Sequence, residues 1–240
     1  MRIRRPTSPV NRLLKALPLE EQLLVAANSE TVELAAGDIL CEYNQIPRHV
    51  YFPLSGLISL VVSIDDQAPL ELAMIGSEGM LGATKILGIR EAPMRGVVQL
   101  KGQAVRMTVS AFEELSKNGS QLQAVVKRHL FVLMTQLNRA AGCTHFHEVS
   151  SRLARWLLMA HDRSPSEKFF LTQQFLSEIL GVQRSAVSIA AGKLQERGLI
   201  NYVRGDITVL DRKALETAAC SCYAAIMKDQ RRFATLLGTA

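Results

Sequence analysis

The chain has 240 residues, 48% of them hydrophobic, and a formal net charge of +6. This length exceeds the common single-domain size, so we expect two domains, and the apolar content is sufficient to fill their cores. No stretch approaches the roughly 18 apolar residues of a membrane span. The basic, proline-containing start (1–9) is unlike a secretory signal peptide, so we expect cytoplasmic residence.

The positive charge is unevenly distributed along the chain. Residues 1–120 carry 12 Lys or Arg against 13 Asp or Glu, a balance of −1, whereas residues 121–240 carry 16 against 9, a balance of +7. A surface that binds phosphates requires such a basic excess, so the C-terminal half is the candidate for contact with nucleic acid. Within 164–212 the balance is only 6 against 5, and charge alone therefore does not identify the partner.

The cysteines predict no metal site. There are four, Cys41, Cys143, Cys220 and Cys222, and they form no paired CxxC framework, which disfavours a tetrathiolate zinc site or a disulfide scaffold. Cys143 is close in sequence to His145 and His147, which leaves three metal ligands conceivable there, but we favour a polar connection between helices. On one continuous helix Cys220 and Cys222 would lie roughly 200° apart, so we expect them to pack in a core.

The N-terminal half is predicted to be rich in strands. Residues 10–27 form two short helical pieces divided by Pro18. Turn residues then separate seven short apolar segments, 31–34, 39–41, 50–54, 57–62, 70–75, 96–100 and 104–107. Many short strands at this spacing are typical of a sandwich or barrel. The region has no nucleophile elbow, phosphate loop or HExxH pair, and it contains only one histidine. We therefore do not expect an enzyme active site in this barrel.

The longest helical pattern follows a short helix at 109–118 and runs over 120–141. Its apolar residues recur in steps of 4, 3, 4 and 3, at Val126, Leu130, Leu133, Leu137 and Ala140. This heptad-like spacing predicts a dimerisation helix with a seam at the first four of these positions. The alternative is a helix packed only on its own β region. A further helix is predicted over 147–163.

Residues 171–210 read as helix, turn, helix and hairpin. Thr172 is a good N-cap, and Gly181 suits the tight turn between the two helices. The second helix is expected over 183–197, followed by a hairpin that turns at Arg204-Gly205 and by a last helix capped by Asp211. This order is typical of a winged helix-turn-helix, which places its second helix in the major groove of DNA.

The start of the second helix presents side chains that can read DNA. Gln183, Arg184, Ser185 and Ser188 can all hydrogen-bond to base edges or phosphates, and arginine can bind guanine through two hydrogen bonds. The alternative interpretation is an ordinary solvated helix start. The hairpin that follows directly favours the DNA reader.

Two segments carry a family resemblance, SSRLARWLLMAHDR (150–163) and LTQQFLSEILGVQRSAVSIAAGKLQERGLI (171–200). With the order of the parts, they resemble the Crp/Fnr family of bacterial transcription regulators over nearly the whole chain. The resemblance implies an α+β fold in three parts, namely a β-roll sensor region at 1–118, a dimerisation helix at 119–145 and a winged helix-turn-helix region at 146–240. It implies double-stranded DNA, a second copy of the chain and RNA polymerase as partners.

The resemblance also assigns roles to residues. The base-reading positions fall on Gln183, Arg184, Ser185 and Ser188. The contacts to the DNA backbone are expected at Thr172, Gln173, Lys193, Arg197 and Arg204. Ile189 lies in the same region but cannot hydrogen-bond, so the preferred operator is expected to differ from the commonest ones of the family.

An effector pocket is expected at Glu78, Gly79, Arg95, Leu137 and Asn138. Arg95 could bind a phosphate, but its hydroxyl partner is missing, and the threonine-serine pair that faces adenine in the family is Leu137-Asn138 here. Buried polar atoms of cyclic AMP would then go unpaired, which predicts poor binding and an unknown small-molecule effector instead. No cofactor is identified, since no cysteine precedes Cys41 to form an iron–sulfur cluster and nothing supports haem binding.

The sequence therefore favours a non-enzymatic, homodimeric DNA-binding regulator. The alternative is a ligand-binding regulatory protein whose β region acts without DNA. A mobility-shift assay on DNA from upstream of the gene separates the two.

Overall fold

The protein is described by a computed structural model that covers residues 10–65, 69–117, 119–164 and 168–236. Its helices are α1 (Arg12–Lys15), α2 (Leu19–Ala27), the 3-10 helix η1 (Ala83–Leu87), α3 (Val109–Leu115), α4 (Gln121–Phe146), α5 (Val149–His161), α6 (Gln173–Leu180), α7 (Arg184–Glu196), α8 (Arg212–Ala218) and α9 (Cys222–Leu236). Its strands are β1 (Ser29–Leu34), β2 (Ile39–Cys41), β3 (His49–Pro53), β4 (Leu57–Val62), β5 (Leu70–Ile75), β6 (Arg95–Leu100), β7 (Gly102–Thr108), β8 (Lys168–Phe170), β9 (Ile200–Val203) and β10 (Asp206–Val209). Among these residues no helix is long and apolar enough to cross a membrane.

The β-rich N-terminal region consists of two antiparallel sheets, with strand orders β1-β7-β3 and β2-β6-β4-β5. Inward residues of both sheets meet in one core, in which Phe52 from β3 and Ile58 from β4 are fully buried. All seven predicted strands are present, and three have the predicted bounds. The apolar alternation and the turns located them correctly. At Gly56, for example, φ is +84° and a Cβ would lie 2.6 Å from the carbonyl oxygen of Leu100.

The long helix α4 begins where the side chain of Ser120 accepts a hydrogen bond from the amide of Gln123, as N-caps do. It continues to Phe146, five residues beyond the predicted end. Two polar side chains of α4 point into the β-rich region. The amide of Met74 donates to Gln136 Oε1 (3.3 Å), and the amide of Met80 donates to His129 Nε2 (3.1 Å). These hydrogen bonds fix the rotation of α4 about its own axis relative to the strands.

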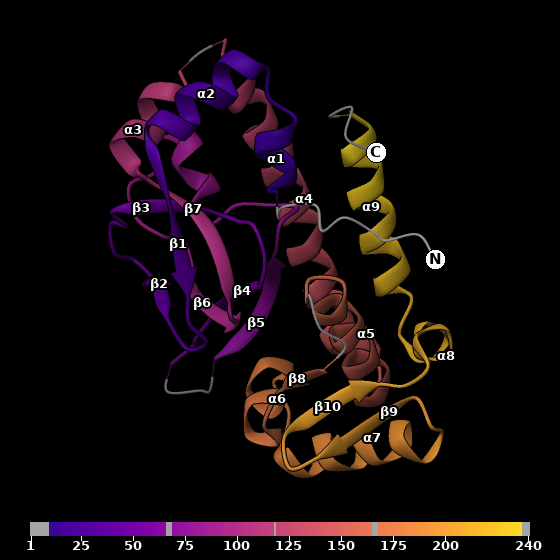
Figure 1. The fold of residues 1–240 in the computed structure, drawn as a ribbon. Helices are drawn as coiled ribbons and strands as arrows, with labels where there is room; N and C mark the ends of the chain where they lie inside the picture. Colours follow the sequence, from indigo (N-terminus) through magenta and orange to yellow (C-terminus); the bar gives the residue numbers. More distant parts are fainter. Residues whose placement is uncertain (1–9, 66–68, 118, 165–167, 237–240) are drawn as a thin grey trace.

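The C-terminal region is built around α5 and the winged helix-turn-helix, seen below the β-rich region in Figure 1. The only tryptophan of the chain, Trp156, is completely buried in its core, with its ring edge-on to Phe175 of α6. Leu57 and Met74 of the β-rich region belong to the same core. The two regions therefore share buried apolar surface.

Two buried polar contacts also join these regions. The indole nitrogen of Trp156 donates to Glu71 on β5 (2.8 Å). Arg163, just after α5, donates to Glu78 through Nε (2.8 Å) and Nη2 (2.5 Å), and the Arg163 side chain is only 4% exposed. Both acidic residues come from the β-rich region, and both of their partners come from the C-terminal region.

The prediction of a single helix after Asp211 is wrong, because the structure has two helices there, α8 and α9. Asp211 does cap α8 by accepting from the amide of Ala214, but the chain turns at 219–221 and α9 runs back along α4 (Figure 1). An ion pair between Arg139 and Asp229 (2.9 Å) joins α4 to α9, and Phe233 is buried in the N-terminal core. The turn also places Cys220 outside the helix.

Candidate nucleic-acid interface

The two helices of the candidate reading head form as their sequence predicts. The Thr172 hydroxyl caps α6 by accepting from the amide of Phe175 (3.1 Å), and Gly181 ends that helix in the left-handed conformation with φ +60°. Helix α7 then begins at Arg184 with Gln183 as N-cap, and Gln183 makes no side-chain capping bond. The amides of the first turn of α7 thus receive no capping bond from that side chain.

Helix α7 divides cleanly into a buried and an exposed face. Its buried residues are Val187, Ala190, Ala191 and Leu194. The predicted base-reading residues Gln183, Arg184, Ser185 and Ser188 are all exposed, as is Ile189 (62%). The burial pattern leaves one continuous face of the first two turns open to a partner.

Polar contacts between α6 and α7 organise that face. The Ser188 hydroxyl donates to Gln173 Oε1 (2.9 Å), and Arg184 Nε approaches the same oxygen (3.5 Å). Sequence reasoning placed Gln173 with the DNA backbone contacts and the other two with base reading. The structure brings the three side chains together on one exposed surface.

The wing is a three-stranded sheet of order β8-β10-β9, in which β8 adds a strand to the predicted hairpin. Arg204 and Gly205 turn the hairpin with φ of +52° and +95°, as the predicted turn requires. Tyr202 ties the wing to the start of α6 through a hydrogen bond from its hydroxyl to the carbonyl of Leu171 (2.8 Å). Arg204 therefore projects at an exposed tip beside the reading head, whereas Lys193 and Arg197 are exposed at the far end of α7.

Comparison with known proteins agrees with this geometry. Residues 151–218 match the model of the Crp-like helix-turn-helix domain. The chain is 25% identical over 175 residues, 67% of its own length and 79% of the relative's, to the cAMP-activated global transcriptional regulator Vfr of Pseudomonas aeruginosa. These matches support a regulator of the Crp/Fnr family.

Solved structures show that the Crp/Fnr fold extends over most of the chain. A crp/fnr family regulator from Eubacterium rectale has a TM-score of 0.67 at 17% identity, covering 86% of this chain and 96% of that one. The c-di-GMP responsive regulator CLP of Xanthomonas campestris has a TM-score of 0.64 at 16% identity, covering 81% and 100%. These structures confirm the predicted α+β fold, which has a β-rich region, a long helix and a helix-turn-helix. Together with the family model and the relative Vfr, they support a DNA-binding transcription regulator.

The five predicted effector residues are not gathered around one cavity. Glu78 is bound to Arg163, and Gly79 packs so tightly on His129 that a Cβ would lie 2.4 Å from the ring. Arg95 forms an ion pair with Glu42 (2.8 Å). On α4, Leu137 is half-buried and Asn138 is exposed.

A different set of residues lines a cavity in the β-rich region. Its walls are mainly apolar and include Cys41, Leu60, Met80, Met94 and Leu133. One cation, Lys85, lines it as well, and burial lowers the pKa of its ammonium group. Nothing in the local sequence signals this cavity, because its walls come from segments that only the fold brings together.

Sequence reasoning also missed the contacts between the β-rich and C-terminal regions and a cluster of three cysteines and one histidine. Cys143, His147, Cys220 and Cys222 place their ligand atoms within 4.8 Å of one another. The expectation that Cys220 and Cys222 point apart is wrong, since only Cys222 lies in a helix. His145 is exposed and stacks edge-on with Phe146, outside the cluster. The available signals were the spacings Cys-x3-His and Cys-x-Cys.

Proposed function

We propose that the chain regulates transcription as a homodimer that reads a near-palindromic operator with the exposed face of α7. The single observation that carries the proposal is this face, on which Arg184, Ser185 and Ser188 stand exposed at the start of the second helix of a Crp-like helix-turn-helix domain. A helix in this position enters the major groove, where its N-terminal residues meet base edges. Half-sites are then about one helical turn, ~34 Å, apart.

The chemistry of the face suggests which bases it reads. Arg184 suits guanine, to which it can donate two hydrogen bonds. Ile189 is 62% exposed next to Ser188, and an apolar side chain there suits the methyl group of thymine. Lys193, Arg197 and Arg204, together with Thr172 and Gln173, are assigned to the phosphate backbone. These roles separate sequence reading from charge neutralisation.

Substitutions of Arg184 and Arg204 test this division of roles. Arg184→Ala is expected to weaken operator binding by ~1–3 kcal/mol per half-site and to relax preference at one base position. Arg204→Ala is expected to weaken binding to all DNA sequences equally. It should also reduce the slope of log affinity against log salt concentration by about one unit. Mobility-shift titrations on a matched and a singly altered operator, over a salt series, measure both effects.

Two outcomes of these titrations would contradict the proposal. If Arg184→Ala weakens both operators equally, Arg184 contacts phosphate, and specificity comes from Ser185, Ser188 or DNA shape. If the unaltered chain shifts no DNA from upstream of its gene, with or without added small molecules, the alternative of a regulatory protein that acts without DNA is favoured.

Dimerisation is proposed through α4, but not through the whole predicted seam. Of the four predicted positions, Val126 and Leu133 are buried in the core of their own protomer, which corrects the prediction. An outer stripe of exposed residues recurs one position further on, at Phe131, Met134, Asn138 and Ala141. Helix α9 covers the other side of α4, where Arg139 meets Asp229, so this outer stripe is open to a second copy.

The spacing of the outer stripe supports a helix–helix interface. Its steps of 3, 4 and 3 residues follow the heptad pattern by which two helices pack side by side. Phe131 and Met134 are 59% and 53% exposed and lie one turn apart on the same stripe, so they form a contiguous apolar patch that a partner can cover. Leu130 and Leu137, both half-buried, border the stripe and widen it.

Charged substitutions in the outer stripe should yield monomers. Phe131→Glu combined with Met134→Glu places two carboxylates where two apolar surfaces would meet, and an unpaired buried charge is not tolerated there. Sedimentation velocity should show a dimer for the unaltered chain and a monomer for the double variant. The matched control is Leu23→Glu on α2, which is 63% exposed and should leave the dimer intact. A dimer that survives both stripe substitutions would place the interface elsewhere.

The effector is proposed to be a small molecule other than cyclic AMP, although the relative Vfr is described as cAMP-activated. Arg95 is already paired with Glu42, and Leu137 offers no hydrogen bond to a base. The mainly apolar cavity that contains Lys85 suits a ligand with less polar surface than a nucleotide. CLP, described as c-di-GMP responsive, shares the fold, which by itself does not determine the ligand.

A further inference from the structure

Four soft metal ligands from distant parts of the chain meet at the junction between the long helix and the C-terminal region. Cys143 and His147 lie one turn apart at the end of α4, Cys220 lies in the turn between α8 and α9, and Cys222 begins α9. The sulfurs of Cys143 and Cys220 are 3.5 Å apart, and the sulfur of Cys222 is 3.7 Å from His147 Nδ1. All four ligand atoms lie within 4.8 Å of one another.

The separations of 3.5 and 3.7 Å are those between neighbouring ligands of a single tetrahedral ion. With bonds of about 2.3 Å to sulfur and 2.0–2.1 Å to nitrogen, neighbouring ligand atoms around zinc lie roughly 3.5–3.8 Å apart. An iron–sulfur cluster would hold its thiolates farther apart, because several irons and sulfides lie between them. The four cysteines of the chain are free thiols, and 3.5 Å between two sulfurs is far beyond the ~2.05 Å of a disulfide bond.

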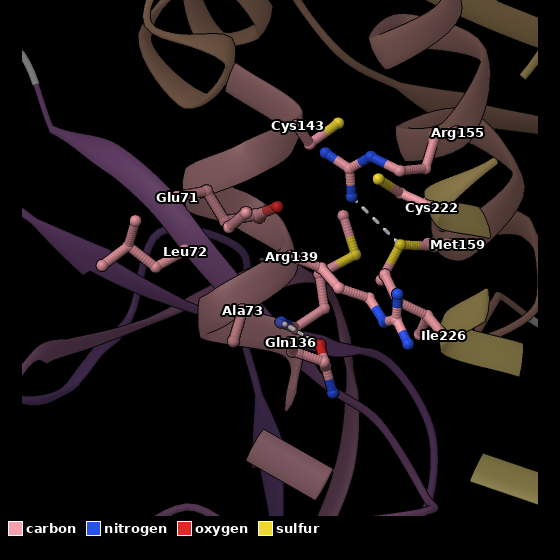
Figure 2. Close-up of a pocket in the computed structure, with 12 residues that line it drawn as sticks. Glu71, Leu72, Ala73, Gln136, Arg139, Cys143, Arg155, Met159, Cys222 and Ile226 are labelled. Carbon is pink, nitrogen blue, oxygen red and sulfur yellow. Dashed lines mark hydrogen bonds between the residues drawn. The ribbon is translucent and has the colours of Figure 1, made fainter. Parts of the chain in front are cut away.

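The surroundings supply positive charge for such a centre. Zinc bound by three thiolates and one neutral imidazole carries a net charge of −1. Figure 2 shows the sulfurs of Cys143 and Cys222 beside the guanidinium group of Arg155, whose Nε is buried and has no hydrogen-bond partner. Arg152 on α5 is also buried, and its guanidinium donates to the carbonyl of Leu180.

We propose that Cys143, His147, Cys220 and Cys222 bind one zinc-type divalent ion in tetrahedral geometry. The three thiols release their protons to solvent on binding, and His147 coordinates through Nδ1, the ring atom that faces the cluster. Three thiolates and one imidazole are a known structural zinc set, and sulfur-rich tetrahedral sites select zinc over the harder divalent ions.

The position of the site gives the ion a structural task. His147 is the C-cap of α4, and α5 begins two residues later, so the ion fastens the α8–α9 turn to the point where the long helix ends. The amide of Cys220 also donates to the carbonyl of Ser151 on α5 (3.2 Å). The ion therefore joins the end of α4 to the start of α9, and the backbone hydrogen bond of Cys220 connects this point to α5.

Metal titration of the full chain tests the proposal without DNA, so its result is independent of the proposed function. The chain is reduced with a phosphine, stripped with a chelator and titrated with cobalt(II), whose tetrahedral thiolate complexes absorb strongly in the visible range. One equivalent should bind with that spectrum, and zinc should displace it. No uptake, or uptake with an octahedral spectrum, would overturn the proposal, as would iron and sulfide in the purified chain.

Variants identify the ligands. Cys220→Ser combined with Cys222→Ser should weaken cobalt binding by more than 100-fold, since losing even an outer-shell partner costs about 10–100-fold. Cys41→Ser and His145→Gln are the matched controls, and both should bind as the unaltered chain does. Uptake that survives the double substitution would assign the ion to other residues. The titration of the unaltered chain keeps the test valid if a variant fails to fold.

Discussion

Replacing Arg163 with methionine is expected to lower the free energy of unfolding by about 3–5 kcal/mol, the usual cost of breaking a buried ion pair from one side. Burial alone would raise the pKa of the Glu78 carboxyl, but the Arg163 guanidinium reverses this and holds that pKa below its usual value. Without Arg163 the carboxylate is left in the interior with no opposite charge. Urea unfolding followed by Trp156 fluorescence measures the loss.

Two further variants show whether the ion pair causes this loss. Glu78→Gln alone should cost a similar amount, and Glu78→Gln with Arg163→Met should cost less than the sum of the two, because neither charge is then left unpaired. Lys117→Ala removes an ion pair with Glu114 in which both side chains are about two-thirds exposed, and should cost less than about 1 kcal/mol. Additive losses in the double variant would contradict the assignment.

The Glu71→Gln variant is expected to remove a pH dependence of stability. Burial raises the pKa of Glu71 from 4.5 to about 7, although hydrogen bonds from Ser59 and Trp156 and the charge of Arg155 favour the ionised form. The folded state therefore holds this proton more tightly than the unfolded state. The contribution of Glu71 to the free energy of unfolding is fully present below pH 4.5 and is lost as the pH rises to about 7. This contribution amounts to at most ~3 kcal/mol.

The difference between the unaltered chain and Glu71→Gln isolates this effect. His129 acts in the opposite direction, because burial lowers its pKa from 6.5 to about 4 and its contribution is lost as the pH falls through that range. Since His129 is present in both proteins, its contribution cancels in the difference. Urea unfolding between pH 4.5 and 8 should show a difference that changes with pH up to about 7 and is constant above it. A difference that is constant over the whole range would show that Glu71 is not held protonated.

The local elements of this fold could be predicted because their signals are local. Thr172 and Ser120 begin helices through their own side chains, and Gly181 and Gly205 take backbone conformations that other residues avoid. The face of α7 that offers Arg184 and Ser188 followed directly from helical spacing. Predictions of this kind depend on residues within a few positions of each other.

The errors arose where distant segments compete for the same surface. The apolar residues of α4 could have faced a second copy or their own strands, and spacing alone could not show that Leu133 faces inward while Phe131 faces outward. Similarly, a chain turn at 219–221 breaks the last helix and brings Cys220 to Cys143, 77 residues away. Glu78, expected in a ligand pocket, is instead bound to Arg163, 85 residues on. Each outcome depends on the packing of whole elements.

The return of α9 to the first half of the molecule has a consequence for the order in which the protein is built on the ribosome. Phe233 lies in the same core as Phe52 and Leu13, so this core is completed only when the chain as far as residue 233 has emerged. Contacts between such distant residues carry a high cost of loop closure and form late. Until then, the α9-facing side of α4 around Val132 is left uncovered on the nascent chain. Synthesis of α9 is thus the step that completes the core of the β-rich region.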